Sequence, residues 1–226
     1  MSCCGHCAGV EEFFDARTAA RDLRRYRRRG ATRSTRLLLE AIRDATPVRG
    51  ATLLDVGGGV GAVQHDLLEA GAAHAVGVDA SPAYQGAALD EARARGHDDR
   101  IDFLTGDAVE LANRLPDADV VTLDRVVCCY PDMAALVDAT APRAGRVYAV
   151  VLPREWWAVR VAIGAMNLAQ RLRRHAFRAY LHGPGHVDRR VRAHGLEPRR
   201  TINTLIWQVR VWERPPRRGR PGEAEA

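Results

Sequence analysis

The feature that most constrains this chain is a glycine-rich turn placed directly after a short apolar segment. The segment 53–56 (Leu-Leu-Asp-Val) is followed by four glycines within positions 57–61. Glycines at a strand-to-helix turn let the backbone approach a ligand at points where any side chain would collide. The pattern therefore predicts an α/β protein that binds a ligand at the end of its first strand.

Further short apolar segments alternate with helical ones along the chain. Such strands, separated by helices, are typical of a parallel sheet covered on both faces. The last two segments have too few residues between them for a crossover helix, so we expect them to pair antiparallel. The sequence predicts a Rossmann-like parallel sheet with a C-terminal antiparallel β-hairpin. The expected strands are 51–56, 73–78, 101–104, 119–123, 146–152, 199–205 and 206–213.

The length of 226 residues suits one domain. We divide it into segments by their hydrophobic periodicity and composition. Residues 1–45 are expected to form an N-terminal helical arm and lid, with helices over 10–29 and 34–45. The predicted catalytic domain covers 46–213 and contains a helical insertion over the active site at 155–183. Residues 214–226 are rich in Pro, Arg, Gly and Glu and are expected to be a disordered tail.

No stretch of about 18 uncharged apolar residues occurs, so we expect no membrane span. The N-terminus does not have the pattern of a secretory signal, and we expect a cytoplasmic protein. The five cysteines are an odd count in two groups, which favours a reducing compartment.

The net charge of +6 leaves a nucleic-acid partner open, because much of the excess lies between Arg17 and Arg36. No recognition motif accompanies this charge, and arginines on solvated helix faces explain it. We therefore expect no nucleic-acid partner. Trp156, Trp157 and the neighbouring arginines allow either a peripheral membrane contact or a lid over the pocket.

The glycine motif alone does not distinguish a dinucleotide from another nucleoside ligand. Gly57-x-Gly59-x-x-Ala62 with Asp79 also fits a dehydrogenase pattern. However, Asp55 beside the glycines would repel a diphosphate, whereas it suits a ligand that carries an ammonium and a sulfonium. The chain thus favours a positively charged adenosyl ligand.

The ordered set of motifs resembles the class I S-adenosylmethionine-dependent methyltransferases. The resemblance covers residues 35–213 and implies S-adenosylmethionine as the cofactor, with Asp79 at the ribose and Asp107 on the adenine side. The cofactor-binding residues that it implies are Asp55, Gly57, Gly59, Gly61, Asp79, Ala80, Asp107, Ala108, Asp124 and Arg125.

A closer resemblance is to the magnesium-protoporphyrin O-methyltransferases. It rests on Tyr130-Pro131 after the fourth strand, on the segment 178–182 (Arg-Ala-Tyr-Leu-His) and on the final hairpin. Those enzymes methylate a porphyrin carboxylate beneath an N-terminal arm. The resemblance implies an acceptor site with the catalytic candidates Cys129, Tyr130, His182 and Tyr26. Cys129 stands where that family tends to carry a histidine, which predicts a different substrate.

The function expected is methyl transfer to a small-molecule acceptor, with O-methylation of a carboxylate or hydroxyl preferred. Two alternatives remain: methylation of a thiol or metalloid through the cysteine pairs, and a basic RNA-binding or RNA-modifying protein. Cys4-x-x-Cys7 with His6 has metal-ligand spacing but lacks a fourth ligand, so we expect no bound metal. We also consider that Cys3, Cys4 or Cys7 approaches Cys128 and Cys129.

Overall fold

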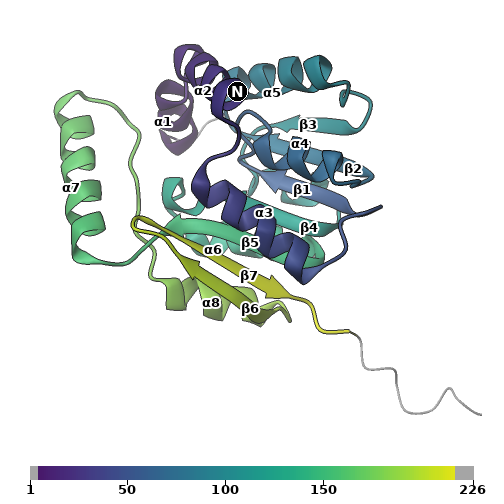
Figure 1. The fold of residues 1–226 in the computed structure, drawn as a ribbon. Helices are drawn as coiled ribbons and strands as arrows, with labels where there is room; N and C mark the ends of the chain where they lie inside the picture. The colour runs from purple at the N-terminus through teal and green to yellow at the C-terminus, as the bar shows by residue number, and fades with distance from the viewer. Residues whose placement is uncertain (1–4, 217–226) are drawn as a thin grey trace, which may run out of the picture.

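The computed structural model describes residues 5–216, which fold around one seven-stranded sheet (Figure 1). The strand order is β3-β2-β1-β4-β5-β7-β6. All neighbours are parallel except β7, which pairs antiparallel with both β5 and β6. The predicted parallel sheet with a terminal antiparallel hairpin is confirmed. The strands are β1 (Thr52–Val56), β2 (His74–Asp79), β3 (Ile101–Thr105), β4 (Ala118–Asp124), β5 (Ala144–Pro153), β6 (Glu197–Asn203) and β7 (Trp207–Glu213).

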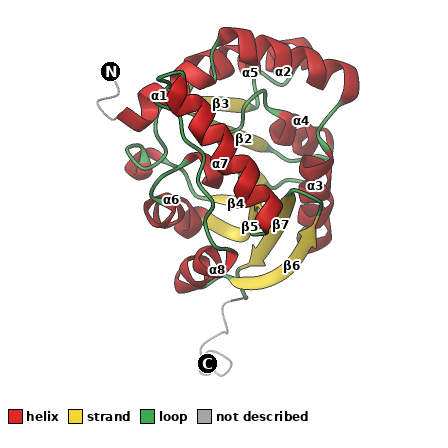
Figure 2. Ribbon diagram, turned by 90° about the vertical axis from the view of Figure 1, so that its left-hand side faces the viewer, coloured by secondary structure: helices red, strands yellow, loops and turns green. Residues whose placement is uncertain are grey.

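Helices cover both faces of the sheet, and α7 lies apart from them at the ends of the strands (Figures 1 and 2). No helix among residues 5–216 is long and apolar enough to cross a membrane. The α-helices are α1 (Gly5–Phe13), α2 (Ala16–Arg29), α3 (Arg33–Ala45), α4 (Ala62–Glu69), α5 (Pro82–Arg95), α6 (Met133–Thr140), α7 (Trp157–Leu172) and α8 (Pro184–Ala193). Short 3₁₀ turns are η1 (Ala112–Arg114), η2 (Val127–Cys129) and η3 (Ala141–Arg143).

The core is divided into two layers by the alternation of side chains along each strand. In β5, Val147, Ala149 and Val151 pack with α3 and α4, whereas Tyr148 and Val150 belong to the layer with α6 and α8. Successive strand residues point to opposite faces, so a strand buried on both faces must be apolar throughout. This is why the central strands are nearly continuous apolar runs.

The N-terminal arm differs from the expected single helix over 10–29. The chain breaks after α1, and the Asp15 side chain accepts a hydrogen bond from Thr18 N at 2.8 Å to begin α2. An aspartate at this position satisfies a backbone N–H that the helix start would leave unpaired. The arm is fastened to α5, because Ser81 Oγ donates to Phe14 O at 2.7 Å and Tyr84 donates to Asp22 at 2.6 Å.

The helical segment that we expected over 155–183 contains one helix, α7, followed by an irregular return. The second difference is the hairpin turn, where Leu205 and Ile206 lie between β6 and β7 rather than within strands. Arg154 N donates to Ile206 O at 2.8 Å, which joins this turn to the start of α7. The tail expected from 214 falls largely outside the described residues.

Candidate active site at the carboxyl ends of the strands

A cavity of about 850 Å³ lies where the parallel strands end. Its floor consists of the loops after β1, β2, β3 and β4, and its other walls come from the arm and from α7. Ligands of open α/β sheets bind at this edge, beside the point where the strand order reverses. Here the reversal lies between β1 and β4, which are adjacent. The cavity therefore occupies the position at which the sequence predicts the cofactor.

The glycine turn after β1 leaves no room for side chains. Gly57 has φ +65°, and a Cβ on it would lie 2.3 Å from Val126 Cγ2. A Cβ on Gly58 would lie 2.4 Å from the Gln64 amide nitrogen and 2.6 Å from the Asp55 carboxylate. The backbone of this turn can approach a ligand because these residues carry no Cβ. Gly61 is not among the cavity-lining residues; it precedes α4 with φ 80°.

Asp79, at the end of β2, lies against the glycine turn. Its carboxylate accepts hydrogen bonds from Gly59 N at 3.1 Å and from Ser81 N at 2.9 Å. Burial raises the pKa of Asp79 to about 6, although both backbone donors lower it. The two N–H groups fix the carboxylate at the cavity wall, and each oxygen retains a lone pair for a ligand hydroxyl.

The raised pKa of Asp79 predicts pH-dependent cofactor binding. A carboxyl with a pKa of about 6 is protonated below that pH and loses the negative charge that attracts a cationic ligand. Affinity should therefore fall as pH drops through about 6, by up to roughly tenfold per pH unit. Titration calorimetry between pH 5 and 8 measures this. The Asp79→Asn variant, which has no such proton to gain, should lack this step, and an identical step in that variant would contradict the assignment.

Asp55 is fully buried beneath the turn, although part of it reaches the cavity wall. Thr122 Oγ1 donates to one carboxylate oxygen at 2.6 Å, and Gln64 Nε2 donates to the other at 3.1 Å. Burial raises the pKa of Asp55 to about 7, against these two donors. These contacts join β1 to β4 and α4, so Asp55 holds the turn in shape as well as lining the site.

Asp107, which the sequence analysis assigns to the adenine side, is in contact with Tyr130. Tyr130 donates its hydroxyl to the Asp107 carboxylate, with both oxygens at 3.0 Å. Val109 N also donates to Asp107 at 2.7 Å. Both side chains line the cavity, as do Ala80 and Ala108. The sequence analysis assigned Tyr130 to catalysis and Asp107 to cofactor binding. In the structure the two side chains are in contact.

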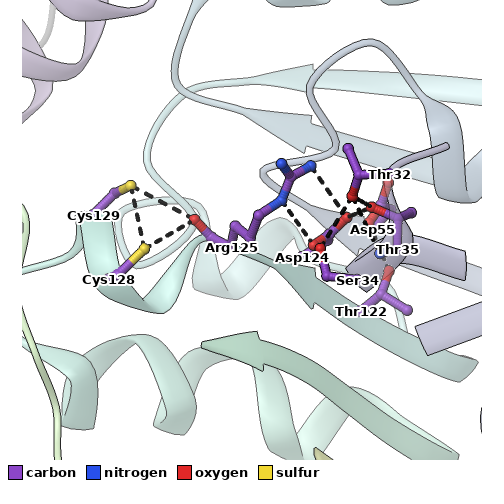
Figure 3. A network of polar contacts seen from close by, with 9 residues as sticks. All are labelled: Thr32, Ser34, Thr35, Asp55, Thr122, Asp124, Arg125, Cys128 and Cys129. Atoms are coloured by element: carbon purple, nitrogen blue, oxygen red, sulfur yellow. Dashed lines mark hydrogen bonds and ion pairs between the residues drawn. The ribbon is translucent and has the colours of Figure 1, made fainter. Parts of the chain in front are cut away.

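Asp124 ends β4, Arg125 follows it, and both form a polar network with the arm (Figure 3). Arg125 Nε lies 3.1 Å from Asp124 Oδ1, and Thr35 donates to Asp124 Oδ2 at 2.6 Å. Arg125 has φ 64°, an uncommon value for a residue with a Cβ, and strained backbone of this kind clusters at functional sites. Thr35 was not singled out in the sequence, because a threonine in a helix 89 residues away gives no local indication of this contact.

Cys128 and Cys129 lie side by side in the turn η2, and both line the cavity (Figure 3). Their sulfurs are 3.9 Å apart, and they lie 3.3 Å and 3.6 Å from Arg125 O. Hydrogen bonding between the two thiols lowers the pKa of Cys128 and raises that of Cys129. Cys3 and Cys4, and the side chain of Cys7, lie outside the described residues. Within the described part, no group of three or more His, Cys, Asp or Glu side chains could hold a metal ion.

The other two catalytic candidates occupy different positions. Tyr26 lies on α2, is buried and lines the cavity. The guanidinium carbon of Arg95 lies over its ring, 4.9 Å from the ring centre of Tyr26. Burial raises the pKa of Tyr26 to about 12. His182 is not among the cavity-lining residues; its Nε2 donates to Tyr130 O at 2.8 Å. In this arrangement, His182 positions the Tyr130 loop.

The sequence analysis missed the apolar part of the cavity. Phe13 and Phe14 of the arm pack against Phe177, with ring centres 4.2 Å and 5.5 Å apart. Ile163 and Met166 of α7 line the same region. Their spacing alone indicates ordinary helix packing, so only the approach of three distant segments shows that they share a site.

The charges around the cavity favour a cation, although the chain as a whole is basic. Five aspartates and two arginines are among its lining residues. The backbone-lined turn and this acidic wall together fit a ligand that carries an adenosine and a positive charge, and not a diphosphate. Residues that could hold such a ligand are Gly57, Gly59, Asp79, Ala80, Asp107, Ala108 and Asp124.

Comparisons with known proteins agree with this geometry. Residues 53–151 match the family model of a methyltransferase domain. No curated protein sequence matches the chain.

Among solved structures, magnesium protoporphyrin IX methyltransferase from Synechocystis PCC 6803, with S-adenosylhomocysteine bound, is similar at a TM-score of 0.70. Its identity is 20%, over 91% of this chain and 98% of that one. An O-methyltransferase family protein from Burkholderia thailandensis is similar at a TM-score of 0.67 and 17% identity, over 91% of this chain and 62% of that one. These similarities show the fold.

The matched domain extends from β1 to within β5, the strands whose ends form the floor of the cavity. The seven-stranded sheet with its terminal antiparallel hairpin has the Rossmann-like methyltransferase fold. Residues 53–151 form a methyltransferase domain, and the whole chain has the fold of class I S-adenosylmethionine-dependent methyltransferases, which supports S-adenosylmethionine as the cofactor at this cavity.

Proposed function

We propose that the enzyme methylates a carboxylate or hydroxyl of a bulky, largely apolar small molecule. The observation that carries this proposal is the cavity, which at about 850 Å³ approaches the upper end of the range for ligand sites and combines a polar with an apolar half. The polar half lies at the strand ends. The aromatic and aliphatic side chains of α1 and α7 line the remainder and suit an apolar acceptor.

Arg25 supports an acidic acceptor. It lies on α2, is exposed, and lines the cavity. No ion pair of Arg25 is found among the described residues, whereas Arg125 is paired with Asp124. A guanidinium can hold a carboxylate through two parallel hydrogen bonds. Arg25 is therefore the cation available to orient an acceptor's acid group.

The catalytic task of the chain is mainly alignment. The cofactor, when bound, supplies an electrophilic methyl group. The arm and α7 exclude water from the space beside it, and Arg25 and the apolar walls orient the acceptor oxygen. A carboxylate acceptor has no proton to lose at neutral pH. The absence of His182 from the cavity wall is compatible with such an acceptor.

The second candidate function is methylation of a thiol or metalloid. It is favoured by one observation, the two thiols of Cys128 and Cys129 lying 3.9 Å apart at the cavity wall. A pair of thiols can bind a soft metalloid. This candidate requires both sulfurs, whereas the O-methylation proposal requires neither.

One experiment distinguishes the two candidates. Transfer of labelled methyl from S-adenosylmethionine is measured with apolar aromatic carboxylic acids, phenols, thiols and arsenite. We expect the carboxylic acids to react, with Arg25→Gln raising their KM by about tenfold. Arg24→Gln, at the neighbouring exposed position that does not line the cavity, is the matched control and should leave KM unchanged.

Two results would contradict the O-methylation proposal. One is transfer only to thiols or arsenite, with loss of activity in Cys128→Ser and Cys129→Ser. The other is transfer to acids or phenols that Arg25→Gln and Arg24→Gln affect equally, which would remove the role assigned to Arg25.

A further inference from the structure

The exposed large apolar side chains are confined to one part of the molecule. Within the described residues they lie only on α7 and on the turn between β6 and β7. Trp157, Leu172 and Leu205 are the most exposed, at 74%, 77% and 70%. The complete set is Trp157, Val161, Leu168, Leu172, Leu205 and Ile206. Single exposed apolar residues are common, but a gathering of this kind marks an interaction surface.

The apolar residues of α7 form a stripe on its outer side. At 3.6 residues per turn, Trp157, Val161, Leu168 and Leu172 fall within roughly 60° around the helix axis. The opposite side of the helix carries Ile163 and other residues that line the cavity. In Figure 2, α7 crosses in front of the sheet with its outer side facing the viewer. The helix is therefore apolar both toward the cavity and away from it.

The hairpin turn continues this surface. Arg154, three residues before Trp157, donates to Ile206 O at 2.8 Å and to Thr204 O at 2.9 Å. Leu205 and Ile206 are thus fastened beside the start of α7, and both also line the cavity. Because these two residues are both exposed and cavity-lining, the apolar surface reaches from the outer side of the molecule to the cavity.

The surroundings of this surface are strongly basic. Residues 154–178 contain six arginines and one acidic residue, Glu155. Arg160, Arg171, Arg173 and Arg174 are exposed, and Glu155 is 3.5 Å from Arg160. An amphipathic helix with tryptophan and leucine on one side and arginines beside them is typical of helices that lie in a membrane interface. Arginine side chains can reach the headgroups while their stems cover apolar surface.

We propose that α7 and the β6–β7 turn dock on the surface of an anionic lipid bilayer. The arginines favour this occupant over a second copy of the chain, because two such surfaces face to face would bring like charges together. Each arginine near an anionic leaflet contributes about 1 kcal/mol of attraction. The helix lies on the bilayer and does not cross it, since it has only 16 residues, about 24 Å.

Docking would place the mouth of the cavity against the acyl-chain region of the bilayer. An apolar acceptor could then enter along α7 without passing through water, and this part of the inference rests on the proposed function. The docking itself does not depend on the acceptor.

The test is flotation of the full chain with vesicles, without cofactor or acceptor. We expect binding to vesicles of equal parts phosphatidylglycerol and phosphatidylcholine, and much weaker binding to phosphatidylcholine alone. The Trp157→Ser/Leu172→Ser variant should bind about tenfold more weakly. Arg171→Gln/Arg173→Gln should also weaken binding, whereas Arg24→Gln/Arg28→Gln, with the same change in net charge on α2, should not.

Circular dichroism establishes that the variants are folded, and analytical ultracentrifugation shows their oligomeric state. Equal binding to both kinds of vesicle, or binding that the α7 variants do not reduce, would overturn the proposal. So would a protein that ignores vesicles but forms a dimer that Trp157→Ser/Leu172→Ser dissociates. Failure here leaves the methyl-transfer result unaffected, because that assay contains no lipid.

Discussion

The Asp79→Ala variant is expected to lose at least about a hundredfold of its affinity for S-adenosylmethionine. Asp79 is the lining carboxylate held by two backbone N–H groups of the glycine turn and of the start of α5. Its removal takes away a charge and leaves Gly59 N–H without its acceptor. Titration calorimetry of the purified variant measures the affinity.

The control for this variant is Asp90→Ala, which removes an exposed carboxylate from α5. It should bind the cofactor as the wild type does. Asp79→Asn should lie between wild type and alanine, since its amide oxygen can still accept from Gly59 N–H. Wild-type affinity in Asp79→Ala would show that the cofactor is held elsewhere.

The Gly57→Ala variant should lose both stability and cofactor binding. Its Cβ would lie 2.3 Å from Val126 Cγ2, and its backbone has φ +65°. The left-handed conformation costs roughly 1–2 kcal/mol for a residue with a Cβ, and the collision adds about 1–3 kcal/mol in a packed interior. Relief of the collision moves the turn on which we expect the cofactor to lie. Urea unfolding and calorimetry measure the two losses.

Two further variants separate these causes. Gly86→Ala, in the exposed middle of α5 where a Cβ meets open space, should be neutral or stabilising. Gly57→Ala combined with Val126→Ala should recover the steric part of the lost free energy but not the backbone part. If Gly57→Ala and Gly86→Ala behave alike, the turn has no need of glycine at position 57.

The sheet could be predicted from the sequence because its strands are local, nearly unbroken apolar runs. All seven strands were expected close to their observed bounds. The short interval between the last two strands, which is too short for a crossover helix, predicted the antiparallel hairpin. The break at Asp15 was missed, although Asp15 and Thr18 have the spacing of a helix cap. The apolar residues on both sides of the break made the arm resemble one continuous helix.

The place of the acidic residues at the cavity could also be predicted, because they directly follow strands. Asp79, Asp107 and Asp124 come to one edge of the sheet for this reason. The apolar part of the cavity could not be predicted in the same way. Phe13 and Phe177 are 164 positions apart, and only the folded arm brings their rings to 4.2 Å. His182 was expected in the cavity, but its ring donates to the Tyr130 backbone instead.

Ser81 connects Asp79 at the cavity wall to the N-terminal arm. Its backbone N–H donates to the carboxylate of Asp79, and its hydroxyl donates to the carbonyl of Phe14, the residue directly after α1. A shift of the arm therefore moves Ser81, whose N–H holds the Asp79 carboxylate, and a shift of Asp79 moves the hydroxyl that holds the arm. Free-energy changes from substitutions in the arm and at Asp79 should consequently fail to add in double-mutant cycles, and kinetic constants for the two substrates should not vary independently.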